Sequence, residues 1–301
     1  MSKVAGQNKT CPAIGYMGLI VQSFVNAGII SCIYALMSVG LALVFGVMGI
    51  LNFAHGELYM VGAYTLWIVY AQAGMPFPVG VIAAMAIVCG LAIAMERGLF
   101  RPMRDRPFTG VLLSIGVSFI LQVFTAQMWG MAMMRHVPPA LKGSLEILGI
   151  FAPWQRLIVI PGALGMLGGL WYFLYKVKAG QALRAAAQDR EAAALQGISI
   201  DRSAALAMGI GGALAAFAGA AVAPILPVTP YMGHSAVITA FIILILGGVG
   251  SLKGALIASF ILGFLHTFVT TYVDGQMATI AGALLMFTVL VFKPRGIMGR
   301  G

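Results

Sequence analysis

Long apolar stretches without a single charged residue dominate the chain, and short polar segments separate them. Seven such stretches together hold 220 of the 301 residues. A helix that crosses the hydrocarbon core of a membrane satisfies its own backbone hydrogen bonds and needs about 20 apolar residues to do so. Several stretches are long enough for two crossings, with breaks expected near Gly40, at 75–78 and at 224–230. The pattern therefore predicts an all-α polytopic membrane protein.

We expect about ten transmembrane helices, or eight or nine if the shorter ones only re-enter the membrane. The predicted helices span residues 14–36, 38–52, 57–74, 79–96, 108–130, 157–176, 203–223, 235–250, 254–272 and 276–292. Residues 1–301 then form a single transmembrane domain. The loops outside it are short, the longest being 131–156 and 177–202, and neither is long enough to fold a catalytic domain.

The positions of the charges orient this arrangement. The chain has 18 Lys and Arg residues and 8 Asp and Glu residues. Short loops rich in Lys and Arg stay on the cytoplasmic side. With ten crossings and both termini inside, 15 of the 18 basic residues lie on one side, and Arg135, Lys142 and Arg156 lie on the other. We therefore expect 177–202 to be cytoplasmic, 131–156 to be periplasmic and both termini to be cytoplasmic.

Common catalytic and binding chemistries find little support in the sequence. The three cysteines and four histidines are scattered and match no metal-ligand spacing, and no disulfide framework is expected. The segment 247–254, GGVGSLKG, resembles a phosphate loop, but a glycine follows Lys253 where Ser or Thr is required, so a tight cytoplasmic turn is expected. No soluble module carries the basic face that nucleic-acid binding needs.

One polar group interrupts the apolar pattern. Asn52, His55 and Glu57 follow a glycine-weakened helix, and ionisable residues within the membrane usually mark a polar pathway or a functional contact. The alternative is that they lie at the cytoplasmic interface and cap the next helix, because the ten-helix arrangement puts this turn on that side. His234 is expected in a capping or loop role near the outer side, and His266 in an interhelical hydrogen bond.

The inner loop predicts a short helix. Residues 181–196 are rich in alanine, lack proline and are bounded by Gly180 and Gly197. This helix is either a solvated connector or a docking helix on the membrane surface that contacts a cytoplasmic partner.

These residues carry a resemblance to a known family. The run 51–57, LNFAHGE, is similar to a motif in the permeases of branched-chain amino-acid ABC importers. The inner loop is similar to that family's pattern at Gly180, Arg184, Ala185, Ala187, Asp189, Ala193, Gly197 and Ile198. Further matches occur in the same order at 96–102, 230–233, 246–251 and 294–297. The resemblance spans nearly the whole chain.

The resemblance implies a subunit of the bacterial inner membrane that moves an apolar amino acid inward by alternating access. It implies four kinds of partner: a second related permease, two cytoplasmic ATP-binding subunits, a periplasmic substrate-binding protein and membrane lipid. ATP and Mg²⁺ would then belong to the partners, and this chain would hold no cofactor and no ATPase site. The helix from Gly180 to Gly197 would be the coupling helix, and Asn52, His55 and Glu57 would line or brace the substrate path.

Substrate and mechanism stay open at this point. A branched-chain amino acid is favoured, while similar permeases serve urea, amides or aromatic carboxylates. A secondary transporter or channel is the rival class, but it predicts paired intramembrane acids, which are scarce here. A membrane enzyme would need a metal or nucleophile constellation.

Overall fold

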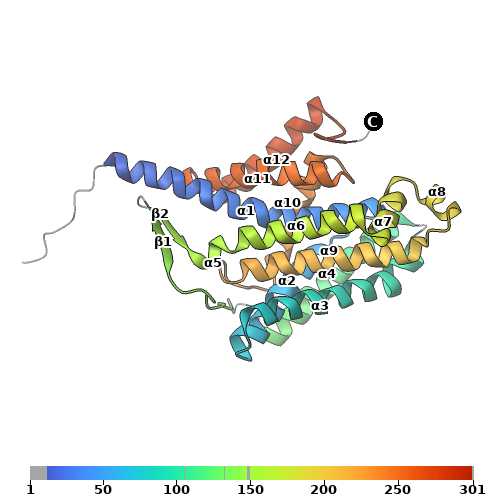
Figure 1. Ribbon diagram of the computed structural model, residues 1–301, viewed down its shortest axis with the longest axis horizontal. Coiled ribbons are helices and arrows are strands. Elements are labelled where there is room, and N and C mark those ends of the chain that lie inside the picture. Colours follow the sequence, from blue (N-terminus) through green and yellow to red (C-terminus); the bar gives the residue numbers. More distant parts are fainter. Residues whose placement is uncertain (1–11, 105, 132, 148–149, 300–301) are drawn as a thin grey trace, which may run out of the picture.

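The computed structural model describes residues 12–104, 106–131, 133–147 and 150–299. Most of these residues form helices that pack side by side in an elongated bundle (Figure 1). Seven helical segments are long and apolar enough to cross a membrane by length and composition. They are Gly18–Met48 within α1 (Pro12–Met48), Phe77–Met103, Phe108–Trp129, Trp154–Lys176, Ile200–Val222, Leu252–Tyr272 and Gly275–Phe292.

The helices behind these spans follow the apolar runs closely. They are α3 (Phe77–Met95) with the π-helix η2 (Glu96–Phe100) and the 3-10 helix η3 (Arg101–Met103), α4 (Pro107–Trp129), α5 (Trp154–Leu157), α6 (Val159–Lys176), α9 (Ile200–Val222), α11 (Leu252–Tyr272) and α12 (Gly275–Phe292). Two shorter helices are α2 (His55–Leu66), which continues as the π-helix η1 (Trp67–Gln72), and the apolar α10 (Met232–Gly247). Eight of the ten predicted helices therefore exist as separate helices.

The predicted break near Gly40 is wrong. The expected helices 14–36 and 38–52 form one continuous helix, α1, which is about 55 Å long at 1.5 Å per residue. Gly40 serves packing instead, because a Cβ atom there would lie 3.0 Å from the carbonyl oxygen of Gly211 in α9. Small residues let helix backbones approach this closely in a membrane.

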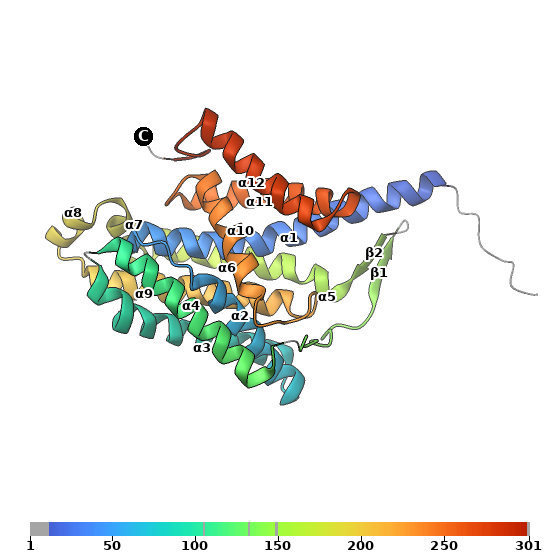
Figure 2. The ribbon, with the colours of Figure 1, turned by 180° about the vertical axis from the view of Figure 1, so that it is seen from behind.

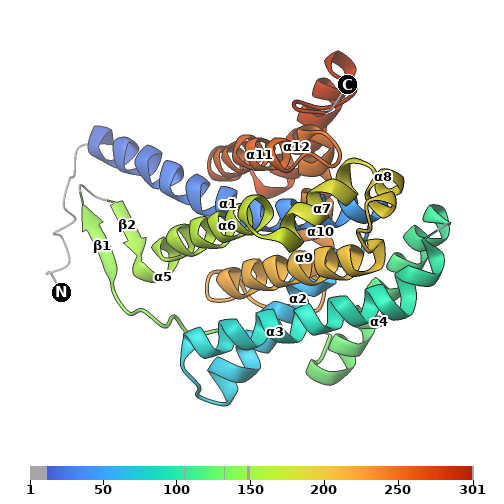
Figure 3. The same cartoon turned by 45° about the vertical axis from the view of Figure 1, so that its right-hand side comes forward.

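The bundle has two ends, which we name by their caps. The hairpin end carries β1 (Ser144–Ile147) and β2 (Ile150–Pro153), an antiparallel pair within the predicted loop 131–156. The α8 end carries α7 (Lys178–Gln188) and α8 (Arg190–Leu195), as Figure 3 shows. The turn between α10 and α11 also lies at the α8 end, where Gly250 approaches Gly46 of α1.

The continuous α1 changes the expected topology. Its Met48 end lies at the α8 end and its Pro12 end lies near the hairpin (Figure 3). The tail after α12 lies at the α8 end, because Ile297 and Met298 donate backbone hydrogen bonds to Leu246 and Gly247. The beginning of α1 and the end of α12 thus lie at opposite ends, which contradicts the expectation of both termini on one side. The predicted N-terminal tail, residues 1–11, lies outside the described residues.

Helix α9 is the centre of the bundle. Sixteen of its 23 residues are buried, and its sequence is dominated by alanine and glycine. Gly219 lies against the backbone carbonyl of Tyr59, and Gly212 lies against Ala92 of α3. A side chain at either position would push a neighbouring helix away, so the small residues of α9 hold α1, α2 and α3 together.

Candidate functional site

Two short helices begin inside the bundle and run in opposite directions. After α1 ends, residues 49–54 lead back into the bundle, and α2 starts at His55 and runs to the hairpin end. After α9 ends, residues 223–231 return from the hairpin end, and α10 starts at Met232 and runs to the α8 end. The two helix starts touch, because a Cβ atom on Gly56 would collide with the carbonyl group of Gly233.

This junction lies near the middle of the bundle. The imidazole Nε2 of His55 is 3.2 Å from the carbonyl oxygen of Met37, which precedes the end of α1 by 11 residues, or about 16 Å. Asn52 contacts Met208, three residues from the midpoint of α9. The sequence placed the polar turn on the cytoplasmic side, and that placement is wrong because α1 crosses the bundle once rather than twice.

Asn52 and His55 are buried and fix the start of α2. The Asn52 side chain accepts a 3.1 Å hydrogen bond from the backbone N–H of Ala54, and its Nδ2 lies 3.6 Å from the sulfur of Met208. His55 binds the α1 backbone through Nε2, while its Nδ1 has no partner among the described residues. Both side chains thus bind within this chain and brace the broken segment.

Glu57 joins three helices. Its side chain is 0% exposed, and its Oε1 accepts hydrogen bonds from Ser118 at 3.0 Å and Gln122 at 2.7 Å, both on α4. Its Oε2 has no hydrogen-bond partner among the described residues and points at the start of α10, 2.8 Å from where Gly233 would carry a Cβ atom. Two helix N-termini, which carry partial positive charge, therefore surround one carboxylate.

The sequence reasoning missed the partners of Glu57. Ser114, Ser118, Gln122 and Thr125 recur at helical spacing and form one polar stripe on an otherwise apolar α4. Ser114 also accepts a 3.0 Å hydrogen bond from the backbone N–H of Phe53. This spacing was the signal that could have paired α4 with the polar turn.

The inner-loop helix is divided. The sequence predicted one helix over 181–196, whereas the structure has α7 and α8 with extended backbone at Asp189 between them. The Asp189 carboxylate caps α8 by accepting a 3.0 Å hydrogen bond from the N–H of Ala192. Gly180 packs so closely on the last turn of α6 that a Cβ atom would collide with the carbonyl group of Phe173. Gly197, at φ +80°, ends α8.

The other predicted loop residues hold α7 and α8 on the bundle. The Arg184 guanidinium lies over the ring of Tyr175, 4.0 Å from its centroid, and Ala193 is buried. Ala187 packs 3.7 Å from the position of a Cβ on Gly46, and Ala185 packs against the core. The predicted set therefore occupies one contiguous region at the α8 end, well separated from the Asn52, His55 and Glu57 group.

Arg190 connects the two regions. Its guanidinium lies directly against Gly49, the first residue after α1, where φ is +63°. Burial, and then the nearby positive charge of Arg104, lower the pKa of Arg190. Arg104 in turn binds the buried carboxylate of Glu96 at 2.8 Å and pairs with Asp201 at the start of α9. Arg190 thus joins α8 to the segment 49–54 by packing, and ion pairs join the turn before α4 to η2 and to the start of α9.

A comparison with protein families explains why these regions occur together. The model of a family described as the permease component of branched-chain amino acid transport systems matches residues 23–294. The chain belongs to this family. The permease fold described above is therefore shared by a set of transport subunits.

Individual relatives agree with this assignment. The permease is 33% identical over 298 residues to LivH of Salmonella typhimurium, which is named a high-affinity branched-chain amino acid transport system permease protein. The aligned region covers 93% of this chain and 96% of LivH. It is also 24% identical to LivM of Escherichia coli, covering 95% of this chain and 72% of LivM. LivH and LivM are both named as permeases of a high-affinity branched-chain system.

A solved structure shares the fold. PsaBC from Streptococcus pneumoniae, in complex with a Fab, superposes with a TM-score of 0.51 at 13% identity, covering 90% of the permease and 91% of that chain. At this identity the similarity shows the arrangement of helices alone.

The exposed tip of α8 is a further feature of the permease that sequence reasoning missed. Leu195 is 87% exposed, although it lies on an alanine-rich helix whose Ala193 is buried. Leu195 lies outside the candidate membrane spans, so its side chain is accessible to a partner. Among the described residues of the permease, no group of three or more His, Cys, Asp or Glu side chains could hold a metal ion.

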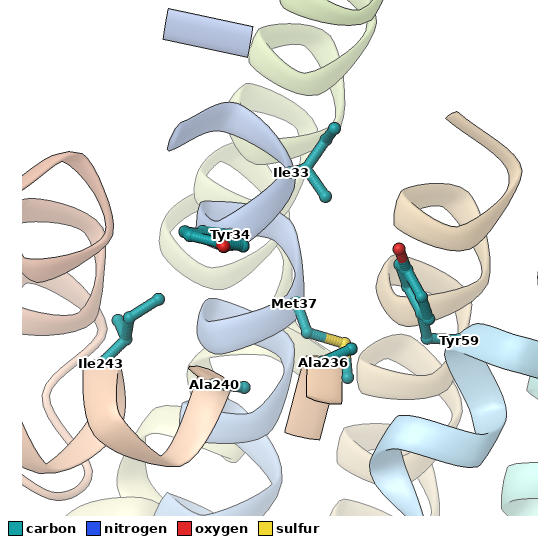
Figure 4. Close-up of a pocket in the computed structure, with 7 residues that line it drawn as sticks. All are labelled: Ile33, Tyr34, Met37, Tyr59, Ala236, Ala240 and Ile243. Carbon is teal, nitrogen blue, oxygen red and sulfur yellow. The ribbon is translucent and has the colours of Figure 1, made fainter. Parts of the chain in front are cut away.

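The cavity beside the helix junction is small. It lies between α1, α2 and α10 and has a volume of about 30 Å³, with Ile33, Met37, Tyr59 and Ala240 among its lining residues (Figure 4). A space of this size holds no more than one or two water molecules. An amino acid does not fit into this cavity of the permease in the state that the structure describes.

Proposed function

We propose that this chain is the membrane-spanning subunit of an ATP-driven importer that moves a branched-chain or other apolar amino acid inward by alternating access. The family match over 23–294 carries the proposal. The named function of LivH, which is similar over nearly the whole chain, supports the substrate class. The small polar group among apolar helices is compatible with a substrate whose side chain is apolar.

The α8 end is proposed to face the cytoplasm. Basic residues concentrate there, as the positive-inside rule requires of cytoplasmic loops. They include Arg97, Arg101, Arg104, Arg106, Lys176, Lys178, Arg184, Arg190, Arg202, Lys253, Lys293 and Arg295, against Arg135, Lys142 and Arg156 at the hairpin end. The loop 131–156 is then periplasmic, the loop 177–202 cytoplasmic, and the membrane is the bacterial inner membrane.

The partners follow from the proposed class. A second related permease completes the membrane part, and the similarity to both LivH and LivM supports a pair of unlike permeases. Two cytoplasmic ATP-binding subunits hold ATP with Mg²⁺ and hydrolyse it, and this chain supplies no ATPase site. A periplasmic binding protein delivers the substrate to the hairpin end.

The coupling element is the α7–α8 unit from Gly180 to Gly197. We place the ATPase contact at the exposed tip, with Leu195 entering an apolar recess on the partner. Gly180, Arg184, Ala185 and Ala187 hold the unit on the bundle, and Asp189, Ala193 and Gly197 shape its tip. A movement of α8 then shifts Arg190, and with it Gly49 and the segment leading to α2.

The transporter exists in a state whose path is open to the periplasm and a state whose path is open to the cytoplasm, and ATP binding changes the relative populations of these two states. The ATPase pair binds ATP more tightly in its closed form, and this difference in affinity is the free energy that moves α8. Asn52, His55 and Glu57 transmit the movement as braces rather than as substrate ligands, because all three are buried and bonded within this chain.

Co-purification followed by reconstituted uptake tests the proposal. The permease is expressed with its cognate permease, ATPases and binding protein, purified, and assayed in proteoliposomes with labelled leucine, isoleucine and valine. Uptake that requires ATP, the ATPases and the binding protein is expected. Uptake without them would instead support a secondary transporter or channel, and competition only by urea, amides or aromatic carboxylates would overturn the amino-acid assignment.

A further inference from the structure

The start of α10 lies at mid-membrane depth and is uncovered. Its Gly233 touches Gly56, and the Asn52–Met208 contact places this junction near the midpoint of α9. The helix lies in front of α1 when the molecule is seen from behind (Figure 2). His234 therefore lies near the middle of the bundle and not near the outer side as its sequence position predicts, because residues 223–231 carry the chain back to the middle.

One stripe of α10 is exposed and partly polar at this depth. Tyr231, His234, Ser235 and Ile238 follow the i, i+3, i+4, i+7 spacing of a single helix face, and all four are exposed. Tyr231 is 51% exposed. We call these four residues the α10 stripe. The opposite side of the helix, at Ala236 and Ala240, faces the small apolar cavity of Figure 4.

Other exposed surfaces at similar depth differ from the α10 stripe. Near the middle of α4, Phe119 and Ile120 are more than 60% exposed, and near the middle of α12, Leu284 and Phe287 are equally exposed. Those surfaces are apolar and suit lipid. The Ser235 hydroxyl donates to the carbonyl oxygen of Met232 at 3.2 Å, so the cost in hydrocarbon falls mainly on the imidazole of His234. Such a group normally faces protein or a water-filled path.

A second observation at the same helix start points to a polar ligand. Among the described residues no side chain caps α10; the N–H groups of Met232 and His234 donate to the backbone carbonyls of Thr229 and Tyr231, and the helix start carries the partial positive charge of its dipole. On the buried side of this helix start, the Oε2 atom of Glu57 has no hydrogen-bond partner among the described residues and points at Gly233. The Glu57 carboxylate also interacts electrostatically with His234. Glu57 is buried and touches no ligand on the stripe, so it acts there only through its field. The field of the carboxylate and that of the helix N-terminus are opposite in sign, which suits the two charges of a zwitterion beside the α10 stripe.

We propose that the α10 stripe lines the transport path at mid-membrane and contacts the charged main-chain groups of the amino acid being carried. The stripe supplies the imidazole of His234, the hydroxyl of Ser235 and the helix N-terminus, while Tyr231 and Ile238 contact the apolar side chain. The path then runs along the outside of this chain, between it and the second permease. This inference rests on the proposed function.

Cysteine accessibility in the assembled transporter tests the inference. In a background with Cys11, Cys32 and Cys89 replaced by serine, single cysteines are introduced as Ser235→Cys and His234→Cys. Matched controls at similar depth and exposure are Ile120→Cys and Leu284→Cys. A membrane-impermeant, positively charged thiol reagent is supplied on both sides of proteoliposomes that carry out ATP-driven leucine uptake. Such reagents react with the thiolate, which forms in water and not in lipid.

The stripe cysteines are expected to react at least about tenfold faster than both controls, because only they face water. Modification of Ser235→Cys is expected to block uptake, and leucine delivered by the binding protein is expected to slow the modification. Stripe cysteines that react no faster than the controls in an actively transporting complex would overturn the inference, as would modification that leaves uptake unchanged. Uptake that proceeds without ATP before labelling would instead overturn the proposed function, so the two failures are distinguishable.

Discussion

At the residue scale, glycines decide where the helices can meet. A Cβ atom at Gly56 would overlap the carbonyl group of Gly233 and lie 2.8 Å from the Cβ of Val237. Two helix starts can therefore meet head to head only because neither carries a side chain at the contact. Gly116 on α4 offers a contrast, since no atom lies within 4 Å of its Cβ position.

The substitution Gly56→Ala is expected to destabilise the permease, whereas Gly116→Ala is not. Overpacking a buried contact costs about 1–3 kcal/mol, while alanine is favoured over glycine by about 1 kcal/mol at an open helix position. Thermal unfolding of the two variants in one detergent, followed by tryptophan fluorescence, measures the difference. Equal melting temperatures would show that the junction tolerates a side chain.

Glu57 makes the second residue-scale prediction. Replacement by Gln keeps an oxygen that accepts from Ser118 and Gln122, whereas replacement by Ala leaves both donors without their acceptor. An unpaired buried polar group costs about 1–3 kcal/mol. We expect Glu57→Gln to assemble normally and Glu57→Ala to unfold at a lower temperature and lose uptake, as measured on the purified complex.

Two variants check this interpretation of Glu57. Ser118→Ala combined with Gln122→Ala removes the α4 donors and should reproduce the loss of stability of Glu57→Ala. A Glu57→Ala protein as stable as the unsubstituted chain would contradict a bracing role. Retained uptake in both Glu57→Ala and Asn52→Ala complexes would show that neither side chain is needed for transport.

At the scale of the elements, apolar runs were enough to predict helices and not enough to place them. Helices such as α6 and α12 begin and end within a few residues of their predicted limits, because loss of apolar character marks the membrane boundary. Gly40 was interpreted as a break because glycine weakens an isolated helix, but its reason is contact with Gly211, far away in the sequence. Depth could not be predicted for Asn52 and His55 without knowing that α1 is continuous.

The α7–α8 unit makes a prediction at this scale. Leu195 is 87% exposed, so Leu195→Ser should leave folding unchanged and weaken ATPase binding. Loss of a leucine from a buried interface costs about 1–3 kcal/mol, which corresponds to roughly 5- to 150-fold weaker binding. Co-purification of the ATPase and its stimulation by the assembled permease measure the effect.

Leu164→Ser is the matched control for Leu195. That leucine is 56% exposed on α6, within the apolar span and away from the α8 tip. It should not alter ATPase binding. If Leu195→Ser left co-purification unchanged, the ATPase contact would lie elsewhere at the α8 end.

At the scale of the whole molecule, one continuous helix places the start of α1 at the opposite end of the bundle from the one that the ten-helix arrangement predicts. Counting α1 as one crossing puts its Pro12 end at the hairpin end, while the tail that binds Leu246 and Gly247 stays at the α8 end. The basic residues still concentrate at the α8 end, which is the end that we propose to be cytoplasmic. The expected orientation is therefore a periplasmic Pro12 end and a cytoplasmic tail after α12.

Site-directed labelling of intact cells tests this orientation. An epitope fused ahead of Pro12 and a Lys142→Cys substitution in the hairpin-end loop should both react with impermeant reagents from outside. A Glu191→Cys substitution on α8 and an epitope after residue 299 should react only after the membrane is permeabilised. Each position lies outside the candidate spans, so depth does not limit access. If the epitope ahead of Pro12 were protected together with Glu191→Cys, both ends would be cytoplasmic, and α1 could not cross the membrane as a single helix.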